Sequence, residues 1–130
     1  MKKRVLLGMA SLLLSVSLLM AQEIPAGVIT AFKRGSSQEL SKYMGDKVNL
    51  VLQGSSANVD KKKATAMMQE FFTENKVNAF DVNHQGKRDE SSFVIGTLTT
   101  TKGKFSVNCF LKKVQTQYLI HQIRIDKINE

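Results

Sequence analysis

The chain has 130 residues and one cysteine, 42% of its residues are hydrophobic, and its formal net charge is +8. This length predicts one domain, and the hydrophobic content is too high for a disordered chain. The single cysteine, Cys109, excludes an internal disulfide, and the scattered lysines and arginines argue against the clustered basic face of a nucleic-acid-binding protein.

Residues 1–21 have the layout of a secretory signal peptide. A basic start over residues 1–4 precedes an apolar run over residues 5–20, and polar residues begin after Ala21. We expect cleavage after Ala21, which leaves a domain of residues 22–130 with 16 basic and 11 acidic residues, a net charge of +5. An uncleaved anchor is the alternative, since the run is only slightly shorter than a membrane span.

This layout predicts an exported protein, periplasmic or secreted. Once the signal peptide is removed, we expect no membrane contact, and export also argues against a nucleic-acid partner. No cysteine lies near the cleavage site, so the protein is not expected to be a lipoprotein.

Two short helices are predicted at the start of the mature domain. Pro25 suits the first turn of a helix, and Gly35 suits its end because glycine accepts a left-handed conformation. Ser36 and Glu39 have the spacing of a capping box, which starts a second helix that we expect to end at Gly45. The residues expected to be buried are Ile24, Val28 and Phe32 in the first helix and Leu40, Tyr43 and Met44 in the second.

A strand and a longer helix follow. Val48, Leu50 and Leu52 alternate with their neighbours over residues 46–53, which predicts a half-buried strand. Gly54-Ser55-Ser56 breaks this strand, and a short strand or loop leads to Asn58. Asp60 is the expected N-cap of the helix. Its apolar stripe, typical of a helix that packs on a core, consists of Ala64, Met67, Met68, Phe71 and Phe72.

Four strands with tight connections are predicted after Lys76. Their apolar positions alternate, and Cys109 falls among those of the third strand, where a buried and unreactive thiol is expected. The four runs are residues 80–84, 93–100, 105–111 and 117–126. The order helix, helix, strand, helix and four strands predicts an α+β fold in which three helices pack on one face of a curved, mainly antiparallel sheet.

Several stretches carry a family resemblance. They are Phe71-Phe72, residues 80–86, residues 95–98, Gly103 with Phe105 and Val107, and residues 120–124. In these stretches the chain resembles an exported Bacteroidetes family of unknown function, the DUF4783 family, within the nuclear transport factor 2-like superfamily. The resemblance implies a cone, in which a bent sheet wraps around three helices, and it implies no particular activity. It also implies a homodimer through the outer face of the sheet, on which Phe110 is expected to lie.

His84 and His121 are the candidate ligand-binding or catalytic residues. Strand alternation places both inside the cone, where they would act as general base and orienting group or donate hydrogen bonds to a ligand. The alternative is that each is an ordinary core or rim histidine bonded to backbone or water. Asp81 and Asp126 are expected on the opposite face from the histidines, so the inward acid on which isomerases of this fold depend is missing.

Two basic sites are weaker candidates. Gln122 and Arg124 share a face and would bind an anionic group, unless Arg124 pairs with a carboxylate on the sheet surface. Lys61-Lys62-Lys63 lies in the first turn of a helix, where free N–H groups attract an anion, unless the three lysines are simply solvated. The sequence contains no metal-ligand cluster, phosphate loop or cofactor motif.

The sequence therefore favours a non-catalytic binding domain of the cell envelope that takes a small molecule or a protein partner and no cofactor. Two alternatives remain open. One is a small isomerase- or hydratase-like enzyme that uses His84 and His121. The other is a structural module that dimerises through the outer sheet face.

Overall fold

The computed structural model describes residues 24–129 of the chain. The predicted signal peptide and its cleavage site lie outside these residues. Among the helices that are described, none combines the length and the apolar character needed to cross a membrane.

Helix α2 (Ala26–Arg34) begins and ends largely as predicted, and helix α3 (Ser37–Ser41) begins where it was predicted to begin. Gly35 has a φ of 61° and closes α2, and the Ser36 hydroxyl accepts a hydrogen bond from the Glu39 N–H at 3.2 Å. The prediction that α3 continues to Gly45 is wrong. The backbone N–H of Ile120 binds the carbonyl of Tyr43, and the chain from Met44 onward is a strand. Pairing with a strand distant in sequence ends this helix early.

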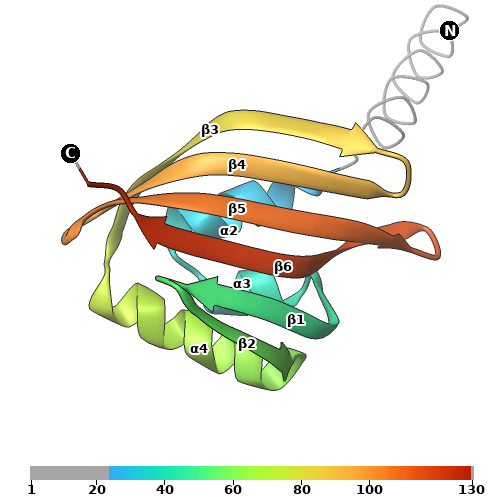
Figure 1. Cartoon of the computed structure of the whole chain (residues 1–130), viewed down its shortest axis with the longest axis horizontal. Helices are drawn as coiled ribbons and strands as arrows, with labels where there is room; N and C mark the ends of the chain where they lie inside the picture. The colour runs from blue at the N-terminus through green and yellow to red at the C-terminus, as the bar shows by residue number, and fades with distance from the viewer. Residues whose placement is uncertain (1–23, 130) are drawn as a thin grey trace, which may run out of the picture.

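Six strands form one sheet in the order β2-β1-β6-β5-β4-β3. Strands β1 and β6 are parallel, whereas all other neighbours are antiparallel (Figure 1). The strands are β1 (Met44–Leu52), β2 (Ser55–Asp60), β3 (Val77–Arg88), β4 (Ser91–Thr100), β5 (Gly103–Val114) and β6 (Gln117–Lys127). This confirms the α+β fold and the run of four antiparallel strands, and it shows that the segment after Gly54 is a strand.

The helices lie on one face of the sheet, and the opposite face, called here the outer face, has no described helix over it (Figure 1). Helix α4 (Lys61–Glu74) starts at Asp60, whose carboxylate accepts a hydrogen bond from the Lys63 N–H at 2.8 Å. The predicted apolar stripe of α4 is buried except for Met67, which is partly exposed. The odd-numbered positions of β5 from Phe105 to Leu111 are all buried, as predicted.

Strands β1, β3 and β6 contain irregularities in their pairing, and those in β3 and β6 reset the alternation of side chains at the two histidines. In β3, Val82 pairs with Gly96 but His84 pairs with Ile95, so Asn83 is an extra residue in the strand. In β6, the pairing passes from Ile120 to Gln122 and leaves out His121. Each extra residue moves the side chains beyond it to the other face of the sheet.

Candidate functional site

Aromatic rings fill the inside of the cone. The Phe32 ring lies 5.1 Å from that of Phe80 and 6.5 Å from that of Phe72, between centroids, and Phe71 lies 5.2 Å from Phe105. Within residues 24–129, every buried polar side-chain atom has a hydrogen-bond partner. These rings therefore form a packed aromatic core, and the described residues leave no buried side-chain polar atom without a partner in it.

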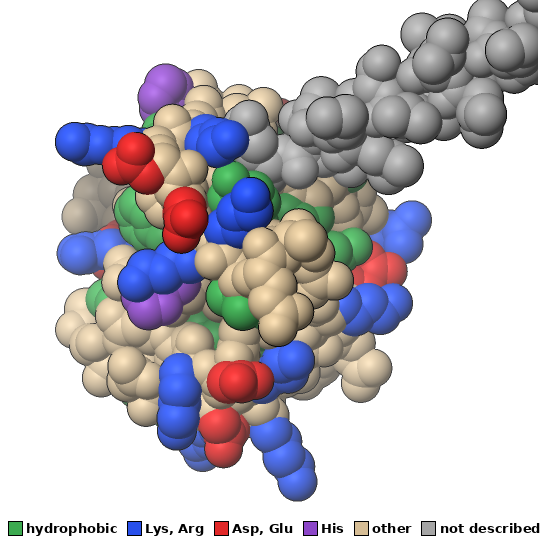
Figure 2. All heavy atoms as spheres, turned by 90° about the vertical axis from the view of Figure 1, so that its right-hand side faces the viewer, with side chains coloured by type: hydrophobic (Ala, Val, Ile, Leu, Met, Phe, Trp, Pro, Cys, Tyr) green, Lys and Arg blue, Asp and Glu red, His purple; other side chains and the backbone are tan. Residues whose placement is uncertain are grey.

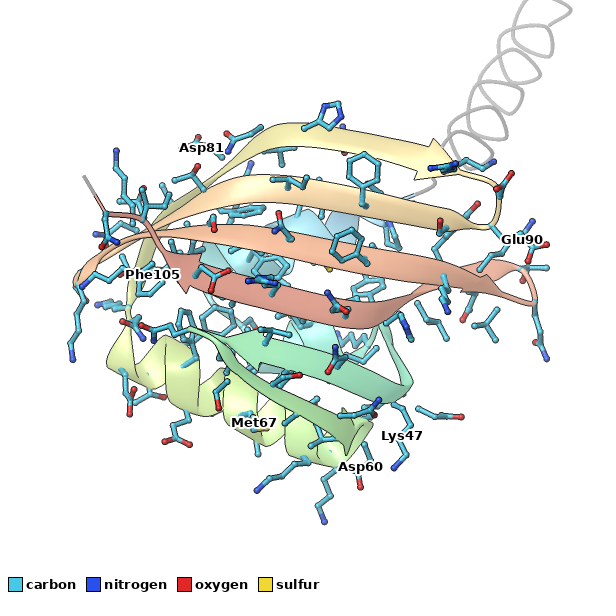
Figure 3. All side chains as sticks on the ribbon, in the orientation of Figure 1. Lys47, Asp60, Met67, Asp81, Glu90 and Phe105 are labelled. Carbon is cyan, nitrogen blue, oxygen red and sulfur yellow. The ribbon has the colours of Figure 1, made fainter. Side chains whose placement is uncertain are left out.

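The prediction that His84 points into the cone is wrong. Its side chain is exposed, and its ring lies 5.3 Å from that of Phe93 on the outer face. Asp81 pairs with Thr97 and His84 pairs with Ile95, so the extra residue Asn83 brings Asp81 and His84 to the same face. Their expected separation to opposite faces is therefore also wrong, and Asp81 projects from β3 away from the helices (Figure 3).

His121 is exposed as well, because the bulge in β6 buries Ile120 in its place. Partial desolvation and the nearby Lys112 ammonium lower the pKa of His121 from its ordinary value, which favours the neutral imidazole. Strands β4 and β5 separate the strands of the two histidines, a spacing of about 14 Å. His84 and His121 therefore share no cavity, and the expected catalytic pair is not formed.

Gln122 and Arg124 lie on the outer face, and both already have partners. The Asn49 amide donates to Gln122 Oε1 at 3.1 Å, and Arg124 Nε donates to the Asp126 carboxylate at 2.8 Å. This arrangement is the surface ion pair that the sequence offered as the alternative to an anion site.

The three lysines at the start of α4 are exposed, and the Asp60 carboxylate provides the negative charge at this helix end. The buried Cys109 is equally unsuited to chemistry, because desolvation raises the pKa of its thiol to about 12. Among the described residues, no three potential ligands lie close enough to hold a metal ion.

An apolar area on the outer face, called here the outer patch, consists of Phe93, Ile95 and Phe110. Phe93 and Phe110 pair directly across β4 and β5, and Phe110 is 38% exposed. Sequence alternation predicted an exposed Phe110. It did not single out Phe93, although its odd position in β4 placed it on the same face. Gly86 makes room for Phe93, since a Cβ on Gly86 would lie 2.9 Å from the Phe93 ring.

A small hollow lies at one end of the cone, beside the start of α2 and the β5–β6 turn. Its volume is about 240 Å³. We call it the end hollow, and it is lined by Pro25, Lys42, Tyr43, Thr116, Gln117, Tyr118 and Leu119. Figure 2 views this end of the molecule, where hydrophobic side chains are visible between lysine, arginine and acidic side chains. No pattern in the sequence groups these residues, because they come from three segments that lie far apart along the chain.

The family model described as "Domain of unknown function (DUF4783)" matches residues 25–126. The chain belongs to the DUF4783 family. A DUF4783 family protein from Bacteroides ovatus is 86% identical over 85% of this chain and 100% of its own, with a TM-score of 0.83. No similar protein was found among the curated sequences.

More distant structures share the fold of this DUF4783 domain. A domain of unknown function with a cystatin-like fold from Nostoc punctiforme is 12% identical, covering 81% of this chain and 73% of its own, with a TM-score of 0.64. An NTF-2 like protein of unknown function from Silicibacter pomeroyi is 10% identical, covering 92% of this chain and 98% of its own, with a TM-score of 0.58. The predicted family and the predicted nuclear transport factor 2-like fold are both confirmed.

Proposed function

We propose that this domain is a non-catalytic binding module that pairs with a second copy of itself through the outer patch. The exposure of Phe110 carries this proposal. Its ring is 38% exposed beside Phe93, on a face that no described helix covers. Paired aromatic side chains on an exposed face are the kind of residue that dominates protein interfaces.

The charges around the outer patch support association of two identical faces. The domain after Ala21 is expected to carry a net charge of +5, so two copies repel each other in general. The neighbours of the patch on β4, β5 and β6 are mostly uncharged, and Arg124 is neutralised by Asp126. These uncharged neighbours are Thr97, Ser106, Asn108 and Gln122. The centres of two outer faces can therefore approach without bringing like charges into contact, whereas Lys112, two residues from Phe110 on the same face of β5, lies at the edge of the patch.

The size of the sheet is also compatible with a dimer. Six strands of this length span about 25 Å by 35 Å. A standard protein interface buries about 800 Å² on each partner, which is of the same order as this face.

We expect the domain of residues 22–130 to dimerise, and Phe110→Lys to weaken the dimer at least about tenfold, because it places a charge on each copy at the centre of the interface. Sedimentation equilibrium over a range of concentrations measures this effect. Val114→Lys is the matched control, since Val114 is 51% exposed at the end of the same strand and outside the patch. A wild-type monomer at millimolar concentration, or equal effects of the two variants, would contradict the proposal.

We also propose that the chain is exported, with residues 1–21 acting as a cleaved signal peptide. The basic start, the apolar run and Ala21 support this proposal. Expression of the full chain in a Bacteroides species, followed by intact-mass measurement of the envelope fraction, should give a protein that begins at Gln22. A full-length mass in the membrane fraction would instead support the uncleaved anchor.

A further inference from the structure

We propose that the end hollow binds a small organic acid with a flat, apolar body. This site is separate from the outer patch, and it does not depend on dimerisation. It also lies outside the interior of the cone, which the phenylalanine rings fill. The ligand class follows from the rigidity, the size and the charge of the hollow.

Tyr43 forms a fixed wall of the hollow. Its backbone N–H binds the carbonyl of Leu40 at 3.0 Å, and its carbonyl accepts a hydrogen bond from Ile120 at 2.6 Å. Its ring lies directly on Gly27 of α2, where a Cβ would overlap the tyrosine hydroxyl. Glycine at this position therefore allows the ring to lie against the helix, and the ring is held before any ligand arrives.

Tyr118 of β6 provides a second aromatic wall. It pairs with Lys113 in the β5–β6 hairpin, close to Thr116 of the turn and to Gln117, the first residue of β6. Both tyrosines are partly buried against the core and partly exposed to the hollow. Two aromatic rings, with Pro25 and Leu119 beside them, suit a planar apolar group, and the hydroxyl and amide groups can fix its orientation.

Lys42 determines the charge of the ligand. It is the only charged residue among the described residues that line the hollow, and it has no ion-pair partner within residues 24–129. A carboxylate next to the Lys42 ammonium would therefore gain a charge-assisted hydrogen bond. The volume of about 240 Å³ is below the range of about 300–1,000 Å³ that is usual for drug-sized ligands, so only a small acid fits.

Three probes of similar size and different charge test this proposal on the domain of residues 22–130. Titration with benzoate, benzyl alcohol or benzylamine is followed by ¹H–¹⁵N NMR. We expect benzoate to shift the signals of Tyr43, Gln117 and Tyr118 and to bind more tightly than the alcohol, with benzylamine the weakest. Lys42→Gln should weaken benzoate about tenfold and leave benzyl alcohol unchanged. Lys47→Gln, on β1 and outside the hollow, is the control and should change neither.

Other results would overturn the proposal. Equal binding of the three probes would show that charge plays no part, and signals shifted only at the outer patch would show nonspecific aromatic binding. The absence of shifts at Tyr43 and Tyr118 at tens of millimolar benzoate would show that the hollow is not a site. A Tyr118→Leu variant that keeps its NMR fold pattern and binds benzoate like the wild type would also contradict the proposal.

Discussion

Replacing Phe32 by alanine is expected to lower the free energy of unfolding by about 3–5 kcal/mol. Phe32 has no exposed surface, and its ring contacts Phe72 of α4 and Phe80 of β3. One side chain of α2 therefore packs against both helix α4 and strand β3. Its removal leaves a cavity that the surrounding rings cannot fill. The loss is a large part of the total stability of a domain, which is about 5–15 kcal/mol. Urea unfolding followed by circular dichroism, at fixed protein concentration, measures it.

Phe32→Leu separates the two parts of this effect. Leucine keeps most of the buried volume but loses the ring contacts, so we expect it to cost less than the alanine variant, about 1–1.5 kcal/mol. If Phe32→Ala costs less than about 1 kcal/mol, then α2 is not packed on β3 as described here.

The helices and β5 were predictable because local rules decide them. Gly35 must be left-handed at a helix end, and Asp60 accepts the N–H of Lys63 three residues later. The stripe of α4 and the alternation of residues 105–111 each put enough apolar surface on one side to fix which side is buried. Neighbouring residues alone contain this information.

The two histidines could not be placed in the same way. Alternation assigns a side chain to a face only if no extra residue intervenes, and Asn83 and His121 are such residues. In β6, a strand that faces inward at Ile120 and a strand that faces inward at His121 would each bury at least one isoleucine. The hydrophobic pattern therefore could not decide whether Ile120 or His121 points inward. Pairing with β5 decides the register, and that pairing is a property of the whole sheet.

The same distinction between local and long-range information applies to the candidate sites. Phe110 was predictable, because it alternates with the apolar positions of a clear strand and shares its face with the polar residues Asn108 and Lys112. The end hollow was not predictable, because it requires Tyr43 and Tyr118 to meet through the parallel pairing of β1 and β6. Parallel strands are connected by many intervening residues, so no local sequence pattern indicates that these two tyrosines lie close together.

Replacing two glycines of the sheet by alanine is expected to change the free energy of unfolding in opposite directions. Alanine usually stabilises a protein relative to glycine by about 0.4–1 kcal/mol when the backbone conformation suits it, because the unfolded chain loses freedom. Gly45 of β1 meets this condition, since the nearest atom to an added Cβ would be Ile120 O at 3.4 Å. Gly45→Ala should therefore be neutral or slightly stabilising, and it serves as the matched control.

Gly96→Ala is expected to have the opposite sign and to cost about 1–3 kcal/mol. An added Cβ would lie 2.6 Å from the backbone oxygen of Asp81 and 2.6 Å from the ring of Phe80. The Phe80 ring cannot move aside, because it is 3% exposed and packs on Phe32. Glycine here lets β3 and β4 approach closely just before the bulge at Asn83, and this contact helps to set the register that carries His84 to the outer face. Urea unfolding of both variants measures the difference, and equal stabilisation by the two alanines would mean that the Phe80 ring does not lie over Gly96.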